Sequence, residues 1–376
     1  MQIWTVELIL WQSSEQSASS LSILWFSFCF MAREGAVSEL PATYGERKQL
    51  YDKISSHRNS SVLAYVTGDR PGLETQMADD VVPLFGDLLD RYDGASRISL
   101  FLYTRGGNTL TAWSLVNLLR EFTHDLEIIV PSKCHSAGTL TVLGADRVLM
   151  TKQATLGPID PSINGPLNPG LPGRAPEQRL PVSVEDIAGY IGLAQEEADI
   201  RDPRGLAQVF LKLAEEVHPI ALGGVKRARS QIEDLARKLL SLHMDEEESQ
   251  ETIDRVVRVL CREAGSHDYM IYRREARQVL NLPIETPSWP LYEDIRDIQR
   301  GFRREMELDV PFNPHLDFGL QVGQSTDYSL LRAAVETQDD GGYHLKRCGR
   351  FEKAKDNQGN EVIQDHLQFD GWKSVS

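Results

Sequence analysis

The sequence has few cysteines, no excess of basic residues and no long apolar run. Its 376 residues include four widely separated cysteines with no C-x-x-C pair. Zinc ribbons and redox motifs are therefore not expected, and the scattered thiols suit a reducing, cytoplasmic compartment. Asp and Glu outnumber Lys and Arg by 55 to 40, which gives a net charge of −15. Binding of nucleic acid through phosphate contacts is therefore not expected.

The N-terminal residues 1–31 form an apolar extension of uncertain purpose. Its apolar run, Leu21 to Ala32, is about 12 residues long, short of the roughly 20 that span a bilayer. No Lys or Arg precedes the run, so the basic region of a secretory signal is missing. We favour an upstream segment before a native start at Met31. A weak membrane anchor and an atypical signal remain open alternatives.

Apolar strand patterns alternate with helical patterns in the first half of the chain. Strands are predicted at residues 61–68, 98–103, 126–130 and 147–150, and helices at 43–60, 79–92, 109–122 and 136–143. The strand ISLFLY at 98–103 is nearly all apolar, as a strand buried on both faces should be. This alternation predicts an α/β fold with a mostly parallel sheet.

The second half reads as helical additions followed by a polar tail. A Pro- and Gly-rich loop is predicted at 157–181, with helices at 183–195, 205–217, 225–243, from 245, 273–280 and 294–307. The region from Pro311 is turn-rich and polar. We therefore predict three parts: the extension 1–31, a main domain at 43–287, and a polar C-terminal extension at 288–376.

Two motifs follow consecutive predicted strands, at the edge where parallel sheets bind ligands. Gly106 and Gly107 follow ISLFLY, and a glycine pair lets backbone amides approach a developing oxyanion. Ser136 follows the strand LEIIV and opens a helix beside Ala137, an arrangement suited to a nucleophile. Taken singly, the glycines could form a plain tight turn and Ser136 could be an N-cap. Together they favour an acyl-transfer site.

These residues resemble the Clp-fold serine peptidases, and within them the serine dehydrogenase proteinase group, which is related to signal peptide peptidase A. The resemblance extends over residues 45–285 and rests on T-x-G-G at 104–107, P-x-x-x-x-S-A-G-T at 131–139, G-A-D at 144–146 and L-G-P-x-D-P at 156–161. It implies a Clp/crotonase-like fold of repeated ββα units, a peptide or protein substrate, a homo-oligomer, and neither metal nor organic cofactor.

The resemblance also implies roles for individual residues. Ser136 falls on the family's nucleophile, and Gly107 and Ala137 fall on its oxyanion-hole donors. Gly106 and Asp160 match supporting positions, Asp160 with a role that could be purely structural. Asp268 lies in a segment, Ser266 to Tyr269, that weakly matches a family motif.

The general base is not identified by the sequence. Residues 153–211 contain no lysine, so a dyad lysine soon after the nucleophile is missing. His267 is the preferred candidate, because it precedes Asp268 and a histidine titrates near neutral pH. His218, Lys212 and Lys226 stay open, although each could equally be an ordinary helix residue.

Two other functions compete with peptide hydrolysis. The missing lysine also suits a catalytically silent oligomeric scaffold. Acyl-CoA chemistry of the crotonase type would explain Gly107, but it gives no reason for a serine at position 136.

Overall fold

A computed structural model describes residues 43–91, 96–160, 162–170, 179–263, 266, 268–339 and 341–376. The chain divides into two units, Met1–Leu40 and Pro41–Ser376. All described residues belong to the second unit, so the predicted extension 1–31 lies outside them.

The described helices match most of the predicted ones within a few residues. They are α2 (Tyr44–Arg58), α3 (Val81–Leu89), α4 (Thr109–Phe122), α5 (Ala137–Leu143), α6 (Val184–Gly192), α7 (Pro203–Glu216), α8 (Pro219–Leu240), α9 (Glu246–Arg258), α10 (Arg273–Gln278), α11 (Trp289–Glu305) and α12 (Pro314–Asp317). Two π-helical turns, η1 (Leu193–Glu197) and η2 (Val259–Glu263), continue α6 and α9.

The strands form one large sheet and two small ones. They are β1 (Ser61–Thr67), β2 (Ile98–Tyr103), β3 (Leu126–Val130), β4 (Lys133–Cys134), β5 (Arg147–Met150), β6 (Thr155–Leu156), β7 (Ser162–Ile163), β8 (Val182–Ser183), β9 (Ile271–Tyr272), β10 (Ile284–Glu285), β11 (Ser325–Thr337), β12 (Gly342–Lys355) and β13 (Glu361–Val375). The large sheet has the order β10-β5-β3-β2-β1-β11-β12-β13.

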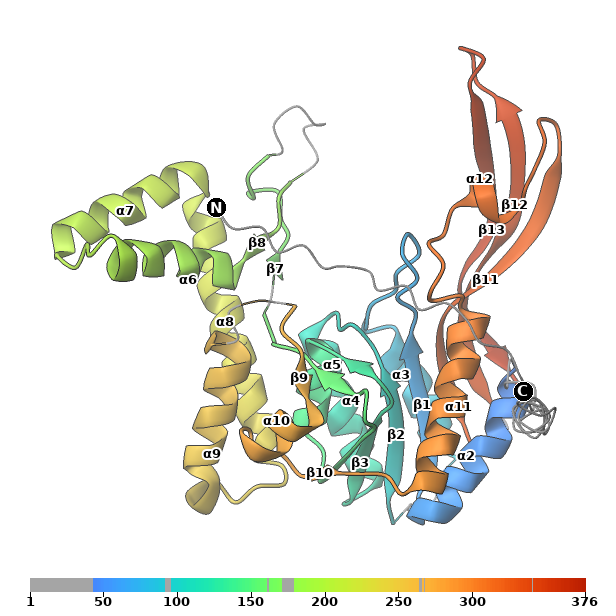
Figure 1. Cartoon of the computed structure of the whole chain (residues 1–376), viewed down its shortest axis with the longest axis horizontal. Helices are drawn as coiled ribbons and strands as arrows, with labels where there is room; N and C mark the ends of the chain where they lie inside the picture. Colours follow the sequence, from blue (N-terminus) through green and yellow to red (C-terminus); the bar gives the residue numbers. More distant parts are fainter. Residues whose placement is uncertain are drawn as a thin grey trace, which may run out of the picture. The chain divides into compact units, whose positions relative to one another are not determined.

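The first five strands of that order are parallel, and the last three join antiparallel. The predicted α/β class with a mostly parallel core sheet is therefore confirmed (Figure 1). The finer expectation of repeated ββα units is not confirmed.

Both faces of the parallel block are buried, which explains its apolar strands. In β2, Leu100 and Leu102 pack into a core with α3, α4 and α5, whereas Phe101 packs into a second core with α2 and α11. Because side chains alternate across a strand, a strand covered on both faces must be apolar at every position. Figure 1 shows α2 and α11 side by side on their face of the sheet.

The C-terminal region differs from its sequence-based description. Instead of turns, the residues from Ser325 form three long antiparallel strands, and β11 pairs with β1 from Leu63 to Thr67. Of β11, only the end that pairs with β1 is continuously buried, and β13 is largely exposed. Because many side chains of these strands face solvent, the sequence lacks the alternation of apolar and polar residues by which a strand is predicted.

Within the described residues, no helix combines the length and apolarity needed to cross a membrane.

Candidate active site

Ser136 has a backbone conformation that is unusual for a residue with a side chain. It lies between β4 and α5 with φ 51° and ψ −114°. It occupies the N-cap position of α5, yet its side chain makes no capping hydrogen bond. The ordinary N-cap interpretation therefore does not explain this serine. Strained backbone of this kind persists where the surroundings enforce it, and it is common at functional sites.

Gly106 and Gly107 adopt positive φ angles of 105° and 145°. A Cβ on Gly106 would lie 2.7 Å from the Ser136 Cβ and 3.1 Å from the Ala137 nitrogen. A Cβ on Gly107 would lie 2.3 Å from the Met77 oxygen. Both positions therefore require glycine, and the T-R-G-G turn packs directly against the Ser136 turn.

The pairing of Gly107 with Met77 orients the Gly107 amide. Met77 donates its N–H to the Gly106 oxygen (2.8 Å), and its own oxygen accepts from the Asn108 N–H (2.9 Å). In such a parallel bridge the central residue, here Gly107, directs its own N–H away from its partner. The opposite side is occupied by the 133–137 segment, since Thr104 pairs there with Cys134. The Gly107 N–H therefore faces the side of Ser136.

Ala137 supplies a second amide at the same place. It is the first residue of α5, and the first N–H groups of a helix have no partner within the helix. These groups also carry the partial positive charge of the helix N-terminus. Two amides, from Gly107 and Ala137, thus flank the Ser136 turn, which is the donor arrangement of an oxyanion hole.

A threonine hydroxyl stabilises each of the two turns. Thr104 Oγ1 accepts from the Gly106 N–H (3.0 Å) and from the Thr67 hydroxyl (2.7 Å). Thr139 donates to the carbonyls of Cys134 (3.0 Å) and Gly157 (2.8 Å). Backbone hydrogen bonds join the two turns, since the Thr104 N–H donates to the Lys133 oxygen (3.0 Å) and the His135 N–H donates to the Thr104 oxygen (3.1 Å).

A small sheet brings a distant segment beside the Ser136 turn. β4 pairs with β6, and β6 pairs with β9, so β9 lies on the far side of β6 from the 133–134 segment. A cavity of about 190 Å³ opens beside the Ser136 turn. It is lined by Arg105, Lys133, His135, Pro158, Asp268, Tyr269 and Met270.

The preferred base candidate, His267, lies outside the described residues. Its two neighbours are described: the Asp268 N–H binds the Ser266 hydroxyl (3.2 Å), and Asp268 lines the cavity. The structure therefore places Asp268, the residue after His267, at the wall of this cavity.

The other base candidates lie on helices that do not present them to Ser136. His218 caps α8, where its Nδ1 accepts from the Ile220 N–H (3.2 Å). α8 meets the end of α5 near Leu239, about 30 Å along the helix from His218. Lys226 is exposed on the first half of α8. Lys212 is exposed on α7 and paired with Glu215 (2.9 Å).

Asp160 has a local structural contact. Its Oδ2 accepts from the hydroxyl of Ser183 (3.0 Å), and that hydroxyl also caps α6. Asp160 therefore fixes the entry to the helical additions. It is not among the residues that line the cavity beside Ser136.

Two residues of the cavity wall were not identified from the sequence. Lys133 and His135 both line the cavity, as alternate residues of one extended segment do. Lys133 Nζ pairs with Asp69 (2.5 Å), and His135 Nε2 pairs with the Thr155 hydroxyl (2.8 Å). The period-two alternation of P-S-K-C-H-S could have indicated their shared side.

Cys134 does not compete with Ser136 as a nucleophile. It is fully buried in the core, and burial raises the pKa of its thiol far above the usual range. The reactive thiolate is therefore not populated. Within the described residues, no three His, Cys, Asp or Glu side chains converge as a metal site would require.

Comparison with known proteins agrees with the motif geometry. Residues 93–178 match the model of a family described as ClpP-like SDH-type serine proteinase. This confirms, over that segment, the family resemblance predicted from the sequence.

Individual relatives and solved structures also match. An uncharacterised protein of Methanocaldococcus jannaschii, MJ0137, is 28% identical over 284 residues, which is 70% of this chain and 82% of the relative. A second from that organism, MJ1495, is 36% identical over 66 residues, 18% of this chain and 23% of the relative. A solved 1510-N membrane-bound stomatin-specific protease, in complex with a substrate peptide, has 14% identity and a TM-score of 0.34, covering 67% of this chain and 84% of that one.

Proposed function

We propose that this chain, whose residues 93–178 match a family of ClpP-like SDH-type serine proteinases, hydrolyses peptide bonds through an acyl-enzyme on Ser136. The observation that carries the proposal is the conformation of Ser136, whose side chain makes no capping bond although its backbone is strained. This hydroxyl lies beside the turn amide of Gly107 and the helix-end amide of Ala137. Such an arrangement suits attack on a carbonyl group and not capping of the helix.

The reaction follows from these positions. Ser136 Oγ attacks the peptide carbonyl, and the N–H groups of Gly107 and Ala137 donate to the resulting oxyanion. The base takes the hydroxyl proton and returns it to the leaving amine when the C–N bond breaks. Water then hydrolyses the ester, and the base again transfers the proton. We assign His267 as this base because the β4-β6-β9 pairing brings its neighbour Asp268 to the cavity beside Ser136.

We also propose a homo-oligomer. α7 contributes no buried residue, and apolar side chains of this helical region, including Leu193, Phe210 and Ile220, are exposed. Exposed apolar side chains gathered in this way are typical of an interface. A second copy of the chain is the partner that would cover them.

Fluorophosphonate labelling tests the nucleophile. We expect one adduct on Ser136 in the wild-type protein, located by intact mass and peptide mapping, because the probe requires an activated hydroxyl. Ser136→Ala should abolish the adduct. The matched control is Ser132→Ala, a nearby serine whose hydroxyl is bonded to Gln299, and it should label like the wild type. A folded, oligomeric wild-type protein that stays unlabelled would instead favour the silent scaffold.

The rate of the same labelling identifies the base. We expect His267→Gln to slow labelling by about 10²–10⁴-fold, the usual contribution of a general base. His218→Gln, Lys212→Met and Lys226→Met should label at the wild-type rate, since their side chains lie on helices away from the site. The assignment fails if His267→Gln labels normally, and a slow rate in one of the other three variants would reassign the role.

A further inference from the structure

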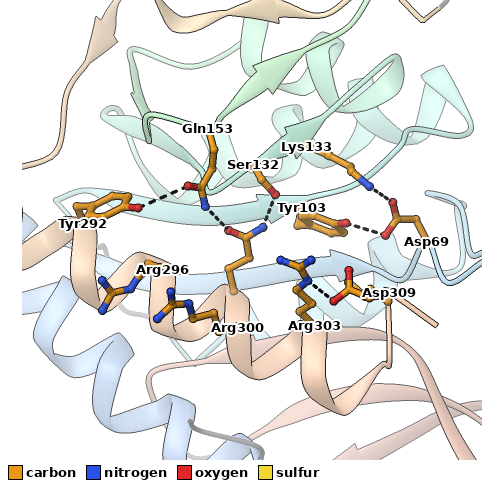
Figure 2. A pocket seen from close by; sticks show the side chains of 12 residues that line it. Asp69, Tyr103, Ser132, Lys133, Gln153, Tyr292, Arg296, Arg300, Arg303 and Asp309 are labelled. Atoms are coloured by element: carbon orange, nitrogen blue, oxygen red, sulfur yellow. Dashed lines mark hydrogen bonds and ion pairs between the residues drawn. The ribbon is translucent and has the colours of Figure 1, made fainter. Parts of the chain in front are cut away.

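A second, larger cavity lies on the other side of Lys133. It has a volume of about 430 Å³ and opens between α11 and the carboxyl ends of the core strands (Figure 2). Its lining residues are Asp69, Tyr103, Ser132, Lys133, Gln153, Tyr292, Arg296, Gln299, Arg300, Arg303, Leu308 and Asp309. Neither the family motifs nor the proposed reaction uses this cavity.

The lining is positively charged although the protein is strongly acidic. Four cations, namely Lys133 and three arginines of α11, face two carboxylates, Asp69 and Asp309. The net charge of the lining residues is therefore +2, in a chain with a net charge of −15. The arginines recur at positions 296, 300 and 303, which one face of a helix brings together.

The four cations of the lining differ in how closely they pair with nearby carboxylates. Asp69 accepts from Lys133 (2.5 Å), and Asp309 pairs with Arg303. Arg296 and Arg300 share Asp297 of their own helix, at 2.9 Å and 3.7 Å. The Arg300 contact is longer than a hydrogen bond, and its side chain is about half exposed (51%). Arg296 has a second carboxylate of its own helix, Glu293, at 3.8 Å, so Arg300 is the less engaged of the two arginines.

The rest of the lining is polar and hydrogen-bonded. A chain of hydrogen bonds runs from Tyr292 of α11 to Gln153, back to Gln299 of α11 and on to Ser132, and Figure 2 draws it across the cavity. Asp69 is anchored separately by the Tyr103 hydroxyl (2.6 Å). The amides and hydroxyls that line the cavity therefore have hydrogen-bond partners. Arg300, with Arg296 one helical turn before it, is the part of the lining that suits an added carboxylate. A guanidinium binds a planar carboxylate through two parallel N–H groups.

Lys133 connects this cavity to the nucleophile turn. It lines both the arginine cavity and the smaller cavity beside Ser136. Ser136 is three positions after Lys133 in the sequence, so their Cα atoms are at most about 11 Å apart. An extended peptide covers about that length in three residues.

We propose that the arginine cavity is a subsite for acidic peptides, in which Arg296 and Arg300 bind a carboxylate about three residues from the scissile bond. The inference rests on the proposed peptidase function. It assigns a substrate class, peptides with an Asp, a Glu or a free C-terminus at that distance.

Peptide binding to the Ser136→Ala protein tests this without requiring catalysis. Fluorescent heptapeptides of alanine are compared with peptides carrying one Glu three residues to either side of the centre, by anisotropy at low salt. We expect one acidic peptide to bind at least about tenfold more tightly than the neutral one. Adding Arg296→Gln and Arg300→Gln should remove that difference, whereas Arg304→Gln, an exposed arginine of α11 outside the cavity, should preserve it.

Three results would overturn the proposal. They are equal affinities for acidic and neutral peptides, no binding of the acidic peptides at millimolar concentration, and a preference that survives in the double arginine variant.

Inorganic phosphate is the competitor. If phosphate binds in an Arg300-dependent manner and the peptides show no acidic preference, the cavity is a site for free oxyanions and not a substrate subsite. Because Ser136 is absent from this assay, failure here is separate from failure of fluorophosphonate labelling.

Discussion

Ser136→Gly should abolish peptide hydrolysis without destabilising the protein. At φ 51° and ψ −114° a residue with a side chain is strained, which costs about 1–3 kcal/mol. Glycine adopts this conformation freely, at a cost of about 0.5–1 kcal/mol in unfolded-state entropy. The free energy of unfolding should therefore be unchanged or raised by up to about 2 kcal/mol. The value of kcat should fall by about four to six orders of magnitude, because the nucleophile is removed.

Denaturant unfolding and hydrolysis of fluorescein-labelled casein measure the two effects. Ser136→Ala should lose the same activity while keeping the strain, so it should unfold at a lower denaturant concentration than Ser136→Gly. Ser183→Gly is the matched control. Ser183 has ordinary extended angles and caps α6 through two backbone N–H groups, so glycine there should lower stability by a few tenths of a kcal/mol. If the Ser136→Gly variant were clearly less stable than the wild type, the serine side chain would be stabilising this turn, and the strain would not indicate a functional role.

The sequence identifies this turn because its constraints are local. Gly106 and Gly107 are dictated by positive φ angles and by contacts with neighbours that the same motif supplies. The strands before them are recognisable because both faces are covered, so β2 and β3 are apolar throughout. Where one short stretch of sequence determines both the backbone conformation and the packing, its pattern is sufficient to predict the local structure.

Elements that depend on distant partners were not predictable in the same way. The C-terminal strands join the core sheet through β11, which pairs with β1 from the other end of the chain. β13 is largely exposed, so its sequence has no apolar periodicity. In the sequence, the arginines of α11 are typical of an ordinary charged helix. They line a cavity only because Tyr103 and Lys133, from distant parts of the chain, lie opposite them. Asp268 likewise reaches the cavity beside Ser136 through the segment before β9, more than a hundred residues from Ser136.

A buried charge cluster joins the parallel core to this C-terminal region. Glu336 of β11 pairs with Arg47 of α2 through two hydrogen bonds, at 2.5 Å and 2.9 Å. It also accepts from the Tyr51 hydroxyl (2.7 Å) and contacts His344 Nε2 (2.7 Å). The side chains of Arg47 and Glu336 are both 0% exposed. Three side chains, those of Arg47, Tyr51 and His344, therefore bind one carboxylate that water does not reach.

Glu336→Ala is expected to lower the free energy of unfolding by about 3–5 kcal/mol, since it leaves the Arg47 charge buried without its main partner. Thermal and denaturant unfolding measure the loss. Glu361→Ala is the matched control, because Glu361 pairs with Lys353 on the surface of β13, and it should unfold almost like the wild type. Adding Arg47→Met to Glu336→Met should recover much of the loss, because apolar residues can replace a buried pair.

The same cluster should set the acid limit of stability. Burial raises the pKa of Glu336, but the charge and hydrogen bonds of Arg47 outweigh it and lower the pKa from 4.5 to about 2. A carboxyl with a lowered folded-state pKa stabilises the fold above its unfolded pKa and loses that contribution as pH falls. Wild-type stability should therefore decline from about pH 5 towards pH 2, and the decline should be much shallower in the Arg47→Met/Glu336→Met variant. An equally steep decline in both proteins would place the acid sensitivity at other carboxylates, such as Asp125 or Glu285, whose pKa values are also lowered by arginine partners.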